Sequence, residues 1–343
     1  MIIDLNSDKQ VISKNAILKQ YSEVDVYRLY IDEDLSIGKR ILSPLRNEKN
    51  PSFVLFKGIT GEICFNDFLL GKGDFVKFVQ MKFGLTYFEA LSRVAIDLGI
   101  QGNYICKHME KTNTSILKSN QPTKEELLSK VVALKLGKNR REWQLHDIQF
   151  WLQFGISIKT LEYFNVEPIS YIHVNGNIFK ADKHAYCFIE EKDGKETYKF
   201  YQPFNTDFKW INNHDDSVWQ GWDKLPKNGD TLIITKSLKD VMSLYEVTGI
   251  PAVSLQSENI SPKRHVFEQL NQRFDMCYLL YDNDFDKEQN WGMIFGTKLA
   301  RELGLIDIWI PDRFKSKDFS DLVKNGGVDN AKKILEQHML MPF

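Results

Sequence analysis

The sequence has few cysteines, and none of them are paired along the chain. Its 343 residues include Cys64, Cys106, Cys187 and Cys277, which stand far apart without a Cys-x-x-Cys pair. Sequence neighbours therefore supply neither a disulfide framework nor a four-thiolate zinc site. We expect these side chains to be small buried hydrophobic groups.

Long hydrophobic runs and an excess of charge are also missing. No apolar run reaches the roughly 18 residues of a membrane span, and the first residues, MIIDLNSDKQ, lack the features of a signal peptide. We therefore expect a cytoplasmic protein with no membrane partner. With 45 basic and 46 acidic residues the net charge is −1. Any binding of nucleic acid must then depend on local basic patches and bound cations.

What is present is the composition of a folded, multidomain protein. Hydrophobic residues make up 43% of the chain and charged residues 27%. A chain of this length has room for two or three domains of roughly 100–200 residues. We expect a linker over residues 106–123, because that stretch is polar and aperiodic.

The linker separates a small first domain from a mixed one. Residues 1–105 combine an amphipathic helical stretch over 15–30, a small antiparallel sheet and two further helices. Residues 124–228 form an α+β region, which begins with a predicted helix over 124–137 and continues into strands.

From residue 229 to 343 the pattern becomes regular. Apolar strands such as TLIIT, PAVSL and CYLLY alternate with amphipathic helices, which indicates a parallel sheet covered on both faces. The fold class is therefore α/β and α+β, in several domains. Ligands of such sheets bind at the carboxyl ends of the strands.

Those strand ends are rich in carboxylates. Asp282 and Asp284 follow one strand directly, and Asp240 and Asp318 follow two others. Carboxylate oxygens at one sheet edge can hold one or two hard cations. The alternative is a turn in which Asp282 and Asp284 bond only to the local backbone.

Three strings in this segment resemble a TOPRIM domain, the metal-binding module of bacterial-type primases, topoisomerases and some nucleases. They are TLIITKSLKDVMSLYEVTGIPAVSL, YDNDFD and KDFSDLV. The resemblance matches Asp240, Asp282, Asp284 and Asp318 to the acidic positions of the family, with Asp321 as a further candidate. Lys236 stands where the family usually has a glutamate.

The first segment resembles the same family independently. LSPLRNEKNPSF is similar to the zinc-ribbon signature of primases. Ser43 and Arg46 stand in the first cysteine and histidine positions, while Asn66 or Asp67 and Leu69 fall near the second ligand pair. Because these residues cannot form a zinc site, we expect a ribbon-shaped module without zinc.

Together the two matches resemble a DnaG-like primase over about two-thirds of the chain, encoded by a phage or mobile element. The resemblance implies primer synthesis on single-stranded DNA from nucleoside triphosphates, with Mg²⁺ or Mn²⁺. It makes Asp282 and Asp284 direct metal ligands, and it lets Asp240 and Asp318 complete a second ion or act through water. Lys199 and Lys209, in a region similar to phage-type primases, are candidates for nucleotide phosphates or are simply solvated lysines.

Lys236 leaves two possibilities for the chemistry. Either the site is inactive, or the missing carboxylate comes from elsewhere. Glu258 follows the second strand of the sheet and is the candidate replacement, in which case Lys236 contacts nucleotide phosphate. The alternative is that Glu258 is only an exposed loop acid.

Nucleic-acid contacts are predicted from local basic stretches. These contain Arg40, Arg46 and Lys49 in the first segment and Lys138, Arg140 and Arg141 in the second. Trp143 and Trp151 are candidates for stacking on bases or for core packing.

Two other functions remain open, an inactive nucleic-acid-binding protein derived from a primase and a TOPRIM nuclease. The sequence has no Walker motif, so a helicase would act as a separate chain.

Overall fold

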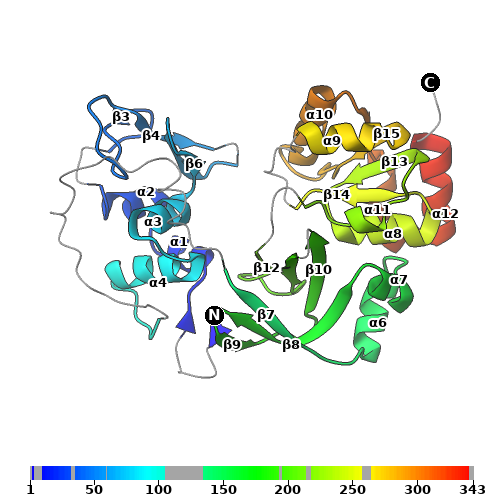
Figure 1. Ribbon diagram of the computed structural model, residues 1–343, viewed down its shortest axis with the longest axis horizontal. Helices are drawn as coiled ribbons and strands as arrows, with labels where there is room; N and C mark the ends of the chain where they lie inside the picture. The colour runs from blue at the N-terminus through cyan, green and yellow to red at the C-terminus, as the bar shows by residue number, and fades with distance from the viewer. Residues whose placement is uncertain are drawn as a thin grey trace. The chain divides into compact units, whose positions relative to one another are not determined.

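The computed structural model describes residues 2–3, 10–31, 35–58, 60–104, 134–192, 195–213, 218–256 and 264–339 (Figure 1). The chain divides into two compact units. Unit 1 comprises Met1–Lys138, Tyr171–Asp182 and Phe204–Lys209, and unit 2 comprises Asn139–Ser170, Lys183–Pro203 and Trp210–Phe343. The linker predicted for residues 106–123 lies outside the described residues.

Unit 1 contains an antiparallel sheet in which the strands follow chain order. The strands are β3 (Arg40–Ile41), β4 (Phe53–Lys57), β5 (Ile63–Asp67) and β6 (Gly71–Gly73). Because side chains alternate between the faces of a strand, Phe53 and Phe65 share the buried face and stack with ring centroids 5.5 Å apart. Phe78 of helix α3 (Phe75–Phe83) packs on both rings, so α3 covers this face.

The helices of unit 1 begin at capping residues. Asp74 caps α3, and Thr86 with Glu89 forms the predicted capping box of α4 (Tyr87–Asp97). The single helical stretch predicted over residues 15–30 is wrong. It forms two helices, α1 (Lys14–Leu18) and α2 (Glu23–Arg28), because Ser22 and Asp25 cap a new helix. The remaining strands of unit 1 are β1 (Ile2–Ile3), β2 (Gln10–Val11) and β9 (Asn177–Lys180).

A second sheet has the strand order β12-β11-β10-β8-β7, with β9 also paired to β8. Its strands are β7 (Leu136–Arg140), β8 (Val166–Val174), β10 (Tyr186–Lys192), β11 (Lys195–Tyr201) and β12 (Trp210–Asn212), and the helices of this region are α6 (Leu145–Leu152) and α7 (Ile158–Tyr163). The helix predicted over 124–137 is wrong at its end, since Leu136 and Gly137 belong to β7, where strand pairing overrides the helical pattern. Residues 124–133 lie outside the described residues.

Unit 2 contains the predicted parallel sheet, in the order β14-β13-β15-β16. Its strands are β13 (Gly229–Thr235), β14 (Ala252–Ser254), β15 (Phe274–Leu280) and β16 (Ile306–Ile308). The helices between and after them are α8 (Leu238–Thr248), α9 (Arg264–Asn271), α10 (Trp291–Leu303), α11 (Phe319–Gly326) and α12 (Val328–Ile334), with shorter turns at Trp222–Lys224, Asp312–Phe314 and Leu335–Met339.

Both faces of this sheet are covered (Figure 1). Ile233 and Leu280 point into a core with α8, α11 and α12, while Leu232 and Leu279 point into a second core with α9 and α10. Alternate residues of one strand thus enter different cores, which explains why the buried second halves of β13 (LIIT) and β15 (CYLL) are almost entirely apolar. The fold is the predicted combination of α/β and α+β regions. Among the described residues, no helix has the length and hydrophobicity to cross a membrane.

Candidate active site

The predicted acidic residues gather where the parallel strands end. Lys236 follows β13, Asp282 follows β15, and Asp240 and Asp318 lie at the starts of α8 and α11. Because the strands are parallel, their carboxyl ends meet at one edge of the sheet. The structure therefore brings these four side chains to a common region.

Asp240 joins the starts of two helices. Its side chain is almost completely buried at 1% exposure. The Ser237 hydroxyl donates a hydrogen bond to Asp240 Oδ2 at 2.6 Å, and the backbone N–H of Ser320 donates to Oδ1 at 3.1 Å. Burial, and next the negative charge of Asp318, raise the pKa of Asp240 above its usual value.

Asp318 caps α11 and is paired with a lysine. The backbone N–H of Asp321 and the hydroxyl of Ser320 each donate to Asp318 Oδ1 at 2.7 Å. Lys239 Nζ lies 3.6 Å from Asp318 Oδ2 and 3.9 Å from an oxygen of Asp321. Burial disfavours the ionised carboxylate, but the Lys239 ammonium and these hydrogen bonds outweigh it and lower the pKa of Asp318.

Lys236 forms an ion pair with Asp282. Its Nζ lies 2.8 Å from Asp282 Oδ2, and both side chains are largely buried. Burial raises the pKa of Asp282; the Lys236 charge lowers it, and the nearby Asp318 raises it further. The position that the resemblance assigns to a glutamate is thus filled by a cation that already neutralises Asp282.

Asp284 lies in a different environment from Asp282. Lys287 Nζ is 2.7 Å from Asp284 Oδ1, and the backbone N–H of Gly292 donates to Oδ2 at 3.3 Å. Burial opposes ionisation, but the contact with Lys287 holds the pKa of Asp284 below its usual value. The two aspartates, predicted to act as a pair, therefore have separate charged partners.

The loop between them is fixed by contacts that the sequence reasoning missed. Asn283 Nδ2 donates to the carbonyl of Ile310 and to Asp312, each at 2.7 Å. A Cβ at Gly292 would lie 2.0 Å from the carbonyl oxygen of Asp282, so only glycine lets α10 approach the loop this closely. The Gly292-x-x-x-Gly296 spacing was the available sequence signal.

Lys199 is half-buried, and its ammonium is bound within the protein rather than solvated. Its Nζ donates to Gln220 Oε1 at 3.0 Å and to the carbonyl of Gln256 at 2.8 Å, and it lies 4.7 Å from the centre of the Trp210 ring. Burial lowers the pKa of Lys199 to about 8. Gln256 follows β14, so Lys199 contacts the strand-end edge of the sheet.

Two other predicted residues are not in this region. Lys209 is exposed and belongs to unit 1, and Glu258 lies outside the described residues.

Some of the basic side chains predicted to contact nucleic acid are exposed, and others are bound to acidic groups of the protein itself. Arg40, Lys49 and Arg140 are exposed, and Lys138 is half-buried. Arg141 makes two hydrogen bonds to the buried carboxylate of Asp147, at 2.5 and 2.9 Å.

The aromatic candidates for base stacking are part of the core. Trp151 is fully buried, with its ring edge-on to Tyr186 at 5.0 Å, so the stacking alternative for it is wrong. Trp143 packs against the same core from its rim. Packing in the core buries the large apolar ring of Trp151 and so stabilises the fold. The periodic pattern of the sequence does not by itself distinguish this role from base stacking.

His146, Asp147 and His184 form a trio whose possible ligand atoms lie within 4.8 Å of one another. Asp147 is already saturated, because Arg141, Tyr186 and the backbone N–H of Gln144 all donate to it. A metal ion here would compete with a guanidinium, so we assign this trio a structural role.

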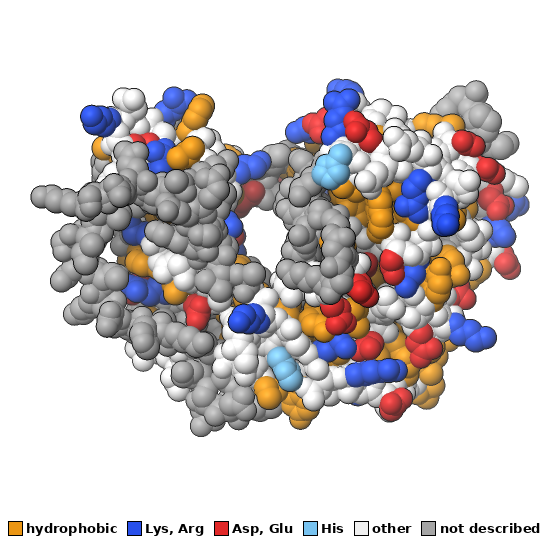
Figure 2. Space-filling view, in the orientation of Figure 1, with side chains coloured by type: hydrophobic (Ala, Val, Ile, Leu, Met, Phe, Trp, Pro, Cys, Tyr) orange, Lys and Arg blue, Asp and Glu red, His pale blue; other side chains and the backbone are white. Residues whose placement is uncertain are grey.

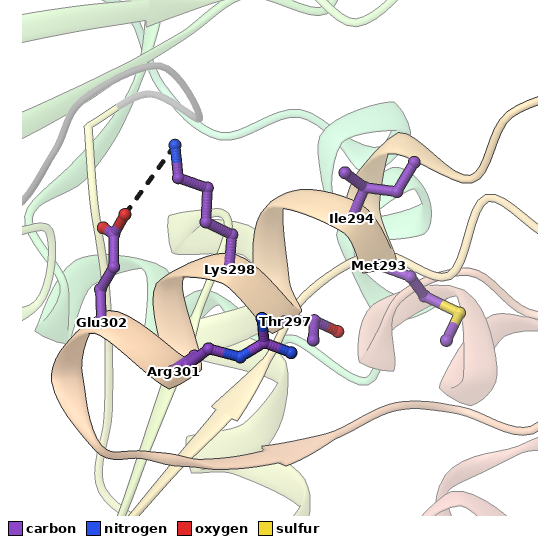
Figure 3. Close-up of a pocket in the computed structure, with 6 residues that line it drawn as sticks. All are labelled: Met293, Ile294, Thr297, Lys298, Arg301 and Glu302. Carbon is purple, nitrogen blue, oxygen red and sulfur yellow. Dashed lines mark ion pairs between the residues drawn. The ribbon is translucent and has the colours of Figure 1, made fainter.

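The surface hollow drawn in Figure 3 is not lined by the carboxylates predicted to bind metal. It is lined by one face of α10, with Lys298 and Glu302 paired at 3.8 Å; its lining residues are Met293, Ile294, Thr297, Lys298, Arg301 and Glu302. None of the predicted site residues line it.

A divalent cation suits the donor chemistry of the strand-end cluster. Asp240 and Asp282 are buried carboxylates whose pKa values are raised in part by Asp318, so the cluster carries negative charge that a cation would relieve. Oxygen donors of this kind are those that Mg²⁺ and Mn²⁺ prefer. At Asp282 the cation would take the place of the Lys236 ammonium.

Several solved structures are similar to this chain. The zinc-binding and RNA polymerase domains of the Aquifex aeolicus primase align with 94% of this chain and 84% of their own, at 14% identity and a TM-score of 0.43. The primase fragment of the bacteriophage T7 primase-helicase aligns with 58% of this chain and 75% of its own, at 18% identity and a TM-score of 0.41. The Escherichia coli primase catalytic core aligns with 55% and 72%, at 16% identity and a TM-score of 0.42.

The sequence comparisons found nothing: no family model and no curated protein matches the chain.

Proposed function

We propose that this protein is a primase-like nucleotidyltransferase that makes short primers on single-stranded DNA from nucleoside triphosphates. One observation carries the proposal. Asp240, Asp282 and Asp318 come from separate strand-helix junctions of a parallel sheet and meet at its carboxyl edge. Their order along the chain is the order of the acidic motifs that resemble a TOPRIM domain.

The reaction joins the 3′-hydroxyl of one nucleotide to the α-phosphate of the next, and pyrophosphate leaves. Bound Mg²⁺ or Mn²⁺ supplies positive charge for the triphosphate. Asp282 and Asp284 would bind the cation directly, and Asp240 and Asp318 would complete a second ion or act through water. Lys236, released from Asp282, would contact phosphate, as would Lys199 and Lys209.

Further parts of this proposal follow from the sequence. Glu258 would supply the carboxylate that Lys236 replaces. Single-stranded DNA would contact the exposed Arg40, Lys49 and Arg140. A replicative helicase would act in trans, and the gene would belong to a phage or a mobile element.

A second function, an inactive nucleic-acid-binding protein derived from a primase, is favoured by the Lys236–Asp282 pair. The ammonium lies 2.8 Å from a carboxylate predicted to bind metal, so the cluster is partly neutralised by its own chain. Such a protein would bind DNA through its basic residues without joining nucleotides.

Primer synthesis distinguishes these functions. Labelled nucleoside triphosphates are incubated with unprimed single-stranded DNA in Mg²⁺ or Mn²⁺, with wild type, with Asp282→Ala/Asp284→Ala and with the exposed matched control Asp329→Ala. We expect short products from wild type and from the control, and none from the double variant. DNA binding without products would favour the inactive protein, and a degraded template would favour a TOPRIM nuclease.

The role of Glu258 has its own test in the same assay. If Glu258 replaces the missing glutamate, Glu258→Gln will lose as much activity as Asp284→Asn. Full activity of Glu258→Gln would rule out that role.

A further inference from the structure

Unit 1 contains a buried ion network centred on Arg46, in the loop between β3 and β4. The Arg46 side chain is only 12% exposed. One of its terminal nitrogens lies 2.5 Å from Glu48 Oε2 and donates to the hydroxyl of Ser52 at 2.7 Å. The guanidinium is therefore directed into the protein and is not presented to solvent.

Glu48 organises this loop around the guanidinium. Its Oε1 accepts hydrogen bonds from the backbone N–H of Ser43 at 2.6 Å and from that of Ser52 at 3.2 Å. The Ser52 hydroxyl also donates to the carboxylate. One carboxylate thus ties the beginning of the loop to its end, and Arg46 supplies the opposite charge that a buried carboxylate needs.

Arg46 also reaches the turn between β5 and β6. Its Nε lies 3.5 Å from Oδ1 of the fully buried Asp67. That oxygen accepts from the backbone N–H groups of Leu69 and Leu70 at 2.9 and 3.0 Å. Arg46 Nε and Asp67 Oδ2 have no hydrogen-bond partner among the described residues, so the charge attraction between the two groups is what compensates their burial.

These two loops are where the sequence resemblance places zinc ligands. Ser43 and Arg46 occupy the first pair of ligand positions, and Asn66 or Asp67 and Leu69 fall near the second. Zinc does not fit this set, because a hydroxyl, a guanidinium and an aliphatic side chain cannot supply thiolate or imidazole ligands. A positive charge already lies between the loops.

We propose that the Arg46 guanidinium joins the two loops in the place that a metal ion would take, as a metal-independent clamp formed by Arg46, Glu48 and Asp67. The planar guanidinium suits this role because it has several donors in fixed directions, whereas a lysine ammonium is a compact point charge. Arg46 is then a positioning residue of unit 1, and this replaces the nucleic-acid contact predicted for it from the sequence. The inference does not depend on primer synthesis.

The clamp also orders the turn that carries an exposed aromatic side chain. Phe68 follows Asp67 directly and is 84% exposed. The bonds from Leu69 and Leu70 to Asp67 close the turn on which Phe68 lies. The clamp therefore orders a turn that presents an aromatic ring to solvent.

Hydrogen exchange of the full-length protein tests the clamp, because the amides of Ser43, Ser52, Leu69 and Leu70 report on its two carboxylates. The variants are Arg46→Met and Arg46→Lys. Arg28→Met is the matched control, since Arg28 is 61% exposed in the same unit and pairs with Asp25 at 3.6 Å. We expect exchange of these amides to be about tenfold faster or more in Arg46→Met, less accelerated in Arg46→Lys and unchanged in Arg28→Met.

A second readout separates the clamp from general unfolding. All seven tryptophans lie in unit 2, so tryptophan fluorescence does not report on unit 1. The denaturation midpoint seen by fluorescence should be the same in Arg46→Met and wild type. If Arg46→Met leaves unit 1 unfolded, Glu48→Gln keeps the side-chain shape and should accelerate the same four amides by a smaller factor.

Adding a chelator or zinc tests whether a metal ion contributes to the order of these two loops. Exchange in the wild type should be the same with EDTA, with added Zn²⁺ and with neither. Acceleration by EDTA, or unchanged exchange in both Arg46→Met and Glu48→Gln, would overturn the proposal.

Discussion

Three of the four carboxylates predicted to bind metal form an ion pair with a lysine of the same chain. Lys236 pairs with Asp282, Lys239 with Asp318 and Lys287 with Asp284, at 2.8, 3.6 and 2.7 Å. Buried charges are costly without a partner of opposite sign, so these lysines stabilise the cluster of acids at the sheet edge. A bound cation would compete with these ammonium groups, and its affinity would depend on how readily Lys236 leaves Asp282.

Glu190 of β10 makes the stability of unit 2 depend on pH. It is buried beside Gly221, and burial, then the charge of Asp223, raise its pKa from 4.5 to about 8. The folded protein therefore holds a proton that the unfolded chain releases. The contribution of Glu190 to stability is fully present below about pH 4.5 and is lost as the pH rises towards 8.

We expect Glu190→Gln to remove this dependence. The difference in unfolding free energy, variant minus wild type, should increase by about 1 kcal/mol or more between pH 5 and pH 8. Chemical denaturation followed by tryptophan fluorescence measures it, because all the tryptophans are in unit 2. A difference that stays constant across this range would contradict the assigned protonation of Glu190.

The close approach of α10 to the end of β15 shapes the site. Gly292 meets the backbone of Asp282, and Gly296, one turn later, meets Tyr281, where an added Cβ would lie 3.2 Å from the Tyr281 Cβ. The helix therefore contacts both residues that follow β15. The N–H of Gly292 also donates to Asp284, so the start of α10 positions the second aspartate.

Alanine substitutions at these two glycines should change the stability of the protein to different extents. Gly292→Ala forces a methyl group onto backbone atoms that cannot yield, and we expect a loss of about 3 kcal/mol in unfolding free energy. Gly296→Ala, the matched control on the same helix, should change the unfolding free energy by less than about 1 kcal/mol, because its contact is less severe and alanine is the better helix former. Fluorescence-detected denaturation compares them. Equal losses of unfolding free energy in the two variants would show that the start of α10 can move away from the loop after β15 without penalty.

The charges of the chain are balanced, and the surface reflects this. Figure 2 shows acidic and basic side chains interspersed over the described part of unit 2, in line with a net charge of −1. No general field attracts a polyanion, so any binding of single-stranded DNA would depend on a few local contacts. In unit 1 the strand register places Arg40, Val54, Asn66 and Lys72 in one row across the sheet, with Arg40 and Lys72 exposed.

The salt dependence of DNA binding tests this row. Each phosphate contact of a single strand adds a slope of about −0.7 to the plot of log affinity against log salt concentration. We expect Arg40→Gln/Lys72→Gln to make the slope less steep by about 1.4, and the exposed control Lys332→Gln, in α12, to leave it unchanged. Fluorescence anisotropy with a labelled single strand measures the slopes. Equal slopes for the double variant and wild type would exclude the row as a phosphate contact.

Much of unit 2 could be predicted from the sequence. Continuous apolar runs such as LIIT and CYLLY determine strands buried on both faces, and the helices between them impose a parallel sheet. Once the sheet is parallel, the residues after its strands must share an edge. The gathering of Asp240, Asp282 and Asp318 follows from local pattern and this single topological rule.

What the sequence alone left open was the partner of each charged side chain. Lys236 lies beside Asp282, 46 positions away, and Arg46 lies beside Asp67, while Arg141 is bound to Asp147 and Trp151 is buried. The sequence around a basic residue does not reveal whether its side chain faces solvent, a phosphate group or a buried carboxylate. Only tertiary structure decides among these, because the energy of a charge depends on burial and on the groups that distant parts of the chain bring within a few ångströms.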